Sequence, residues 1–311
     1  MNETPLEIPL PQRRTDRPVT FTHRVELGFV LLLTGFFKVL GIDTASFVSG
    51  KFLRIVGPLI RPVSRRAEDN IRKSFPDWSE EKIKATTKDV WENLGRTAAE
   101  FSHLEQLKPN LANGRVELIN ENKLRTLTDN GGNAIFFSGH FANWEVLPTA
   151  FQSLGIDQSL VYRAANNPLT DEYIIKRRAK VMTRHQIPKG KRGNRAIIET
   201  LSNNRSLLML TDQKLNSGIS VPFLGRPAMT LNAAARLALK YNIPLVPVSI
   251  DRLGGARFKV EFHDPLPINQ TGKIDDDIYT LTKSMNEALE KFIRERPGQW
   301  LWFHRRWPKG T

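Results

Sequence analysis

Short apolar runs alternate with amphipathic segments from residue 115 onward, and this alternation constrains the fold more than any other feature. The apolar runs have the length of buried strands, while the segments between them carry apolar residues at three- and four-residue spacing, as helices do. We expect strands at 115–119, 134–138, 158–162, 206–211, 244–250 and 257–262, with helices near 143–154, 170–183, 193–203, 229–241 and 275–295. Alternating strands and helices predict an α/β fold, a mainly parallel mixed sheet flanked by helices.

Residues 1–60 differ from the rest and read as a basic tail followed by a membrane anchor, with a second domain over 61–311. Arg13, Arg14, Arg17 and Arg24 precede an apolar run, LGFVLLLTGFF at 27–37. Its 11 residues fall short of the ~20 that span a bilayer. We expect an anchor or hydrophobic hairpin, with the arginines on the cytoplasmic side or on anionic headgroups. A buried core helix is the alternative.

The first 20 residues, rich in Pro, Arg and Thr, are expected to be extended or disordered. Residues 64–107 are expected to be helical, because apolar positions recur at helical spacing and Ser79 with two glutamates provides a helix start.

The charge and the cysteine content limit the chemistry. The formal net charge of +14 favours an anionic partner such as nucleic acid, anionic lipid or an acidic protein. The chain has no cysteine, which excludes disulfides and a cysteine nucleophile. Its 6 histidines form no His-x-x-x-His pair, so we expect no dedicated metal site.

The stretch AIFFSGHFANWE at 134–145 carries the candidate chemistry. A strand ends at His140, and Glu145 follows in the first turn of the next helix, where one imidazole nitrogen could donate to it. The other nitrogen could then take a proton from a hydroxyl. A second strand ends at Asp212 and Gln213, and in open α/β sheets ligands bind at the carboxyl ends of the strands. On spacing alone, a structural role for this pair remains the alternative.

The His140–Glu145 segment resembles the H-x4-D/E motif of the lysophospholipid-acyltransferase superfamily, in the HxxNWE form of the lipid A secondary (lauroyl/myristoyl) acyltransferases. Further segments resemble that family in the same order along roughly residues 20–308: Tyr162-Arg163, Asn167-Pro168, Ile187-Pro188-Lys189-Gly190, Asp212-Gln213, VPFLG at 221–225 and PGQWLWFHRRWP at 297–308.

The resemblance implies a glycerolipid-acyltransferase-like fold and transfer of a fatty acyl chain from acyl carrier protein to a hydroxyl of a lipid A precursor. His140 would act as general base with Glu145 as partner, and no acyl-enzyme is required. The family's essential arginine is assigned to Arg177, with Arg178 as the neighbouring alternative. Asp212 is the equivalent of a downstream acid that pairs with the histidine in related mannoside acyltransferases.

Further expectations concern the substrate contacts, which follow from the resemblance, and the location, which follows from the cationic and apolar segments of residues 1–60. We expect Asn143, Arg163, Arg178, Arg305 and Arg306 to bind substrate, although Arg163 could merely close a loop and the residues around His304 could be structural. The protein is expected at the cytoplasmic face of the inner membrane, as a monomer that needs no cofactor beyond the acyl carrier protein co-substrate.

Three alternatives stay open. The acceptor could be another membrane lipid, such as a phosphatidylinositol mannoside or an ornithine-type lipid. The chain could be a membrane-associated scaffold without catalysis, although His140 and Glu145 are both present. A nucleic-acid-binding protein would fit the charge, but it lacks a recognised motif and leaves the apolar segment 27–60 without a role.

Overall fold

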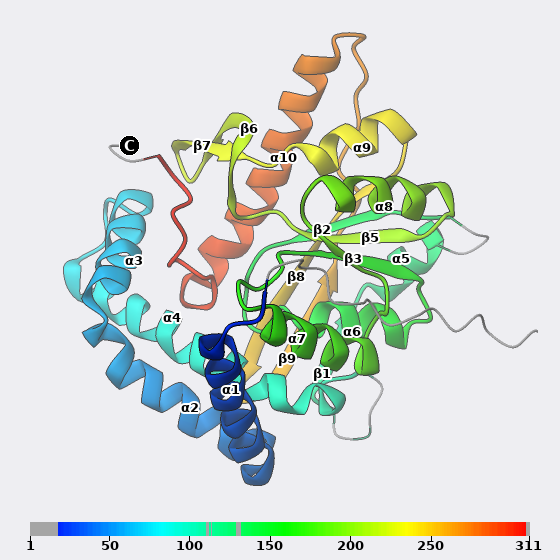
Figure 1. Ribbon diagram of the computed structural model, residues 1–311. Coiled ribbons are helices and arrows are strands. Elements are labelled where there is room, and N and C mark those ends of the chain that lie inside the picture. The colour runs from blue at the N-terminus through cyan, green and yellow to red at the C-terminus, as the bar shows by residue number, and fades with distance from the viewer. Residues whose placement is uncertain (1–17, 110–111, 113, 129–131, 309–311) are drawn as a thin grey trace, which may run out of the picture.

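The computed structural model describes residues 18–109, 112, 114–128 and 132–308. The expected tail 1–20 therefore lies almost wholly outside the described residues. A seven-stranded sheet in the order β1-β9-β8-β2-β5-β3-β4 forms the centre of the molecule (Figure 1). Its strands are β1 Val116–Ile119, β2 Ile135–Ser138, β3 Gln158–Tyr162, β4 Gln186–Pro188, β5 Ser206–Leu210, β8 Leu245–Gly254 and β9 Arg257–Phe262.

The pairs between strands confirm a mainly parallel mixed sheet. Every adjacent pair is parallel except β8 with β9, which is antiparallel. The pair β2–β5 matters most for function, because its register runs from Ile135↔Leu207 to Ser138↔Leu210. The residues that follow these two strands therefore leave the sheet side by side at the same edge.

Helices cover both faces of the sheet (Figure 1). On one face lie α5 Glu121–Thr128, α6 Val146–Ser153 and α7 Pro168–Val181, and on the other α8 Lys191–Ser202, α9 Ala233–Tyr241 and α10 Ile274–Glu295. This division follows from right-handed crossovers, since the strand order advances across α5, α6 and α7 and returns across α8 and α9. The core between the layers includes Phe136 of β2, whose ring centroid lies 4.6 Å from that of Phe151 on α6.

The N-terminal helices form a layer beside the sheet. They are α1 Phe21–Leu40, α2 Ile42–Val56, α3 Arg61–Ser74 and α4 Glu80–Glu100, with 3₁₀ turns at Gly57–Leu59 and Phe101–Gln106. The expected helical region 64–107 is thus confirmed. Helices α2 and α4 approach closely at Gly95, where a Cβ atom would lie 2.4 Å from the carbonyl oxygen of Ser49. This packing ties α2 to the rest of the chain, and the division at residue 60 stays a prediction.

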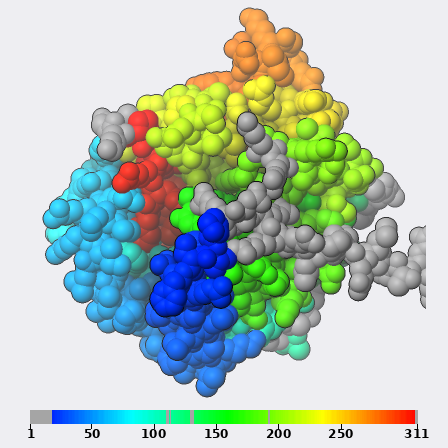
Figure 2. Space-filling model, viewed as in Figure 1, coloured from blue at the N-terminus to red at the C-terminus, as the bar shows by residue number. Residues whose placement is uncertain are grey.

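Helix α1 lies on the surface (Figure 2). In α1, which is described throughout, no residue is buried. The alternative of a buried core helix is therefore wrong for this segment. Asn167, the N-cap of α7, holds α1 by donating to the backbone oxygen of His23 and to the Glu26 carboxylate.

Large apolar side chains remain exposed along α1 and α2: Phe21, Val25, Phe29, Leu31, Leu32, Phe36, Val39, Phe47, Val48, Phe52 and Ile55. Within the described part of the chain, none of the helices has the length and apolar character needed to cross a membrane.

Sequence reasoning missed the hairpin β6 Lys214–Phe223 with β7 Arg226–Thr230. The two residues of its turn, Leu224 and Gly225, have positive φ values of 49° and 75°. A two-residue turn with positive φ at both positions is a common hairpin connection, and the glycine was its visible signal. Because β7 uses residues 226–230, the helix expected from 229 begins at Ala233.

Candidate active site

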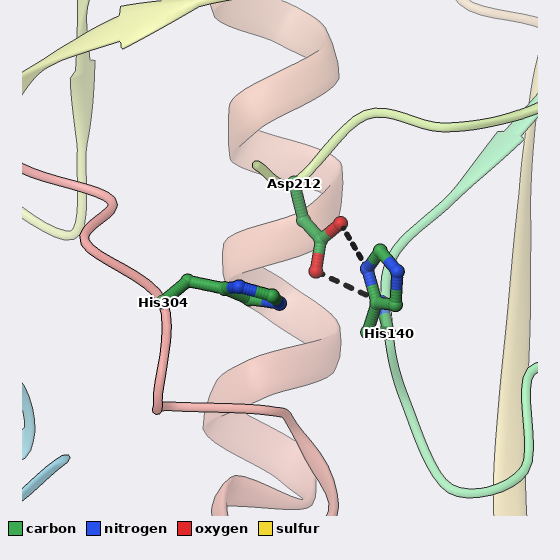
Figure 3. Close-up of side chains that lie close together, drawn as sticks. All are labelled: His140, Asp212 and His304. Atoms are coloured by element: carbon green, nitrogen blue, oxygen red, sulfur yellow. Dashed lines mark hydrogen bonds and ion pairs between the residues drawn. The ribbon is translucent and has the colours of Figure 1, made fainter. Parts of the chain in front are cut away.

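His140 and Asp212 meet at the sheet edge where β2 and β5 end (Figure 3). The imidazole Nδ1 of His140 lies 2.8 Å from Asp212 Oδ1, and the backbone N–H of His140 donates to Oδ2 at 2.8 Å. Gly139 permits this approach, because a Cβ atom there would lie 2.7 Å from the Phe141 ring and 3.2 Å from Asp212. The adjacency of the two strands thus creates a His–Asp pair from residues far apart in sequence.

Asp212 is fully buried and holds its charge through three N–H donors. The third is Trp300 Nε1, 2.8 Å from Oδ2. Burial alone would raise the pKa of Asp212, but the charge of His140 and its hydrogen bonds outweigh burial and hold that pKa well below the ordinary value. An ionised Asp212 requires the proton on Nδ1 of His140, which leaves Nε2 as a hydrogen-bond acceptor.

Glu145 is not the hydrogen-bond partner of His140, contrary to the sequence-based expectation. Its carboxylate pairs with Arg178, whose Nε and Nη2 lie 2.8 and 2.5 Å from the two oxygens, and it also accepts from Trp144 Nε1 at 3.1 Å. Glu145 is the N-cap residue of α6, and its side chain meets α7 rather than the β5 edge. The expectation was wrong because Asp212, and not Glu145, forms the hydrogen bond with Nδ1 of His140.

Arg178, rather than Arg177, is the arginine brought to the site. Burial would lower the pKa of Arg178, but the charge and hydrogen bonds of Glu145 raise it. Arg177 lies one residue earlier on α7 and donates to the backbone oxygens of Phe101 and Ser102 and to Glu105. Arg177 thus fastens α7 to the N-terminal helices, and its assignment to the site is corrected.

Asn143 fixes the loop after His140. Its side-chain oxygen accepts from the backbone N–H of Glu145, while its amide donates to the buried carboxylate of Glu100, which pairs with Arg252 on β8. Asn143 is fully buried among these groups. The direct substrate contact that the sequence led us to expect for Asn143 is therefore wrong, and Asn143 instead positions the loop.

The same loop is held from two further sides. Ala142 has a positive φ of 44°, and its carbonyl oxygen accepts hydrogen bonds from Asn93 and Thr97 of α4. Its backbone N–H donates to Gln299, in the segment leading to Trp300. The N-terminal helices and the C-terminal segment thus jointly set the position of His140.

The C-terminal arginines divide between two roles. Arg306 is fully buried and donates to Met229, Thr230 and Asn286, and burial lowers its pKa to about 10. A substrate-binding role for Arg306 is therefore wrong, because its donors hold β7 to α10. Arg305 is exposed, and so is Arg163, which lines the cavity beside His140. Substrate binding by these two stays a prediction.

Two cavities meet at Trp144, Glu145 and Arg178, which line both of them. The first, of about 130 Å³, is lined by polar groups that include His140, Gln213, Arg163 and Lys189. The second, of about 380 Å³, lies among α1, α4 and α7 and is largely apolar, with Val30, Leu33, Phe37, Leu94 and Ile174 in its wall. A polar reaction centre thus adjoins a space suited to hydrocarbon.

His140, Asp212 and His304 each offer a ligand atom within 4.8 Å of the others, so these described residues could hold a metal ion. The search for histidine pairs missed them because they come from three separate segments. The oxygens of Asp212 are already occupied by N–H donors from His140 and Trp300. This donor set fits a hydrogen-bonded pair better than a set of metal ligands.

Sequence reasoning gave His304 a structural or phosphate-side role and placed Gln213 only at a strand end. Gln213 Nε2 lies 3.3 Å from His140 Nε2 and 3.2 Å from His304 Nε2. The sequence signal for His304 was the family segment around HRRW. This segment can be recognised as a motif, but it does not reveal that His304 lies beside Gln213 at the end of β5.

The two sequence comparisons with known proteins both lead to lipid A biosynthesis acyltransferases. The model of the bacterial lipid A biosynthesis acyltransferase family matches residues 14–309. A lipid A biosynthesis acyltransferase of Haemophilus influenzae is 23% identical over 272 residues, which cover 82% of this chain and 79% of that protein. The crystal structure of the 1-acyl-sn-glycerophosphate acyltransferase PlsC from Thermotoga maritima aligns with a TM-score of 0.35 and 14% identity, covering 86% of this chain and 98% of that one. The family match spans nearly the whole chain, and the chain belongs to the bacterial lipid A biosynthesis acyltransferase family.

Proposed function

We propose that the protein transfers a fatty acyl chain from acyl carrier protein to a hydroxyl of a lipid A precursor, in a late acylation step, with His140 as general base and Asp212 as its partner. One observation carries the mechanism: the His140–Asp212 pair lies beside a polar cavity that adjoins an apolar one. Family membership supports acyl transfer in lipid A synthesis.

The reaction balances without an acyl-enzyme. Nε2 of His140 takes the proton of the acceptor hydroxyl as its oxygen forms a bond to the thioester carbonyl carbon. The tetrahedral intermediate collapses, the carbon–sulfur bond breaks, and the proton on Nε2 passes to the leaving thiolate. The products are an ester and the free thiol of the carrier protein. Asp212 stabilises the imidazolium that forms between the two proton transfers.

Arg178 is the candidate for stabilising the oxyanion. Its Nε and Nη2 are held by Glu145, and neither of these contacts uses Nη1. A cation fixed in this way supplies positive potential at the boundary between the two cavities, where the thioester carbonyl would lie. Glu145 therefore acts through Arg178. Arg163 and Lys189, which line the same polar cavity, would face the phosphates of the substrates.

The apolar cavity among α1, α4 and α7 is the candidate site for the acyl chain. Its neighbour α1 exposes a run of large apolar side chains, which would lie in the cytoplasmic leaflet of the inner membrane. The net charge of +14 would favour anionic lipid and the acidic carrier protein. In this arrangement the lipid acceptor would reach His140 while it remains in the membrane.

The test of this function is acyl transfer by purified protein from acyl carrier protein to an acylated, phosphorylated lipid A precursor, followed by mass spectrometry. We expect a mass gain equal to one acyl group, lost in His140→Ala. Parallel mass spectrometry of lipid extracts from cells with and without the protein would identify the acceptor. If an aminolipid changed in mass while lipid A did not, the acceptor would be the alternative one, an ornithine-type lipid.

A further inference from the structure

Gln213 joins the imidazole of His140 to that of His304. Its side-chain nitrogen lies 3.3 Å from Nε2 of His140 and 3.2 Å from Nε2 of His304. The centroids of the two rings lie 5.3 Å apart and the ring planes are tilted by 63°, so the rings do not stack (Figure 3).

The protonation of both rings determines how Gln213 must be oriented. His140 carries its proton on Nδ1 because of Asp212, so its Nε2 is an acceptor. Burial lowers the pKa of His304 to about 4, so His304 is neutral near pH 7, and its Nε2 can also be an acceptor. An amide NH₂ has two hydrogens and can donate one to each ring, whereas the amide oxygen would face two lone pairs.

His304 is held in place by the N-terminal helices. Its backbone oxygen accepts from Asn70 of α3, and the preceding residue, Phe303, accepts from Arg66 of the same helix. His304 thus provides a fixed acceptor, and the hydrogen bond to it determines which end of the Gln213 amide faces His140.

We propose that Gln213 is a positioning residue for the acceptor hydroxyl, and that His304 orients it. When the acceptor enters, its hydroxyl donates to Nε2 of His140 and its oxygen accepts the N–H that Gln213 gave to that nitrogen. The hydroxyl is then fixed by one bond given and one received, with a lone pair left for the thioester carbonyl. His304 transfers no proton in this scheme. The inference rests on the proposed function, because it requires His140 to be the base.

The test compares variants that keep or remove each hydrogen bond. Gln213→Leu removes the donor and should lower kcat roughly 10–100-fold, the range expected for a misplaced nucleophile, with little change in the KM for acyl carrier protein. Gln213→Glu has nearly the same shape but presents acceptors to both rings, and should be equally slow. His304→Gln keeps an acceptor and should retain most of the activity, while His304→Leu should match Gln213→Leu.

Coupling between the two residues gives the decisive measurement. If His304 acts through Gln213, the double variant Gln213→Leu/His304→Leu should be no slower than either single variant. Gln152→Leu on the exposed surface of α6 is the matched control and should leave kcat unchanged. Circular dichroism and thermal unfolding verify that each variant is folded. If Gln213→Leu does not fold, the kcat of Gln213→Glu tests the role of the Gln213 donor in its place.

Three results would overturn the inference: an unchanged kcat in Gln213→Leu or in Gln213→Glu, multiplicative losses in the double variant, or a His304→Gln variant as slow as His304→Leu. The proposed function fails separately, if His140→Ala and Asp212→Asn remain active. If these two abolish transfer while both Gln213 variants do not, only the positioning role is wrong.

Discussion

Arg178 of α7 binds both carboxylate oxygens of Glu145, which makes the acid of the H-x4-E motif the partner of an arginine rather than of the histidine. The side chains of both residues are largely buried, with 14% and 7% of their surface exposed. The motif therefore holds a cation in the cavity that His140 also lines.

Glu145→Ala should destabilise the protein as well as slow it. It leaves the buried guanidinium of Arg178 without its partner, which costs about 3 kcal/mol. The matched control is Glu172→Ala, which breaks the more exposed Glu172–Lys176 pair on α7, the helix that carries Arg178. This loss should cost less than about 1 kcal/mol. Urea unfolding measures both. Equal stability of Glu145→Ala and wild type would mean that the pair contributes nothing to the fold.

Asp212→Asn should remove activity while preserving shape. The asparagine amide can donate to Nδ1 and so stabilise the tautomer with the proton on Nε2, where the base must be unprotonated. We expect a loss of roughly 10²–10⁴-fold in single-turnover transfer, similar to His140→Ala. Single-turnover kinetics on folded protein check this. Near-normal transfer by Asp212→Asn would show that the histidine works without a buried carboxylate.

The fold class was predictable from sequence, and so was the sheet edge at which the candidate site residues meet. Buried strands such as 134–138 and 206–211 are short apolar runs with polar residues after them, and β2 and β5 confirm that pattern. Asp212 was named as a candidate acid, but its pairing with His140 depends on β5 lying beside β2, a neighbour relation that periodicity does not encode. Spacing favoured Glu145 because it is near in sequence.

Other site features depend on tertiary contacts alone. Arg177 and Arg178 are adjacent on one helix, and only the packing of α7 determines which of them faces Glu145. Similarly, His304 reaches the site because the C-terminal segment returns to the sheet edge, where Trp300 pairs with Phe141. Such a return leaves a motif in the sequence but no geometric signal.

His304→Gln should flatten the acid side of the stability profile. Burial lowers the pKa of His304 to about 4 in the folded protein, whereas it is about 6.5 when unfolded. Between these values the unfolded chain binds more protons, so stability falls as the pH falls from 6.5 to 4, by up to about 3 kcal/mol. Unfolding free energies at pH 7.5 and 4.5 should differ less in His304→Gln than in wild type. An identical difference in both proteins would assign the acid loss to other groups.

Charges on the exposed face of α1 should weaken membrane binding without unfolding the protein. Phe29 and Leu32 lie three residues apart on one face of the helix and are 63% and 68% exposed. Phe29→Glu/Leu32→Glu should reduce co-sedimentation with anionic vesicles and leave the melting temperature within a few degrees. The control places two glutamates on α10, at Ile274 and Tyr279, which are also exposed. Equal vesicle binding by both double variants would exclude α1 as the membrane-contacting surface.

Filling the apolar cavity should change the preferred acyl length. Thr34 lines this cavity from α1, and Thr34→Phe would occupy space that an acyl chain needs. Excluding two methylenes costs about 1.6 kcal/mol, so the rate with the longest accepted acyl donor should fall roughly tenfold relative to a donor two carbons shorter. Val39→Phe adds a large side chain at an exposed position of the same helix and should leave the ratio unchanged. Competition between two acyl carrier protein thioesters, read by mass spectrometry of the product, measures this ratio directly. An unaltered ratio in Thr34→Phe would place the acyl chain outside the cavity among α1, α4 and α7.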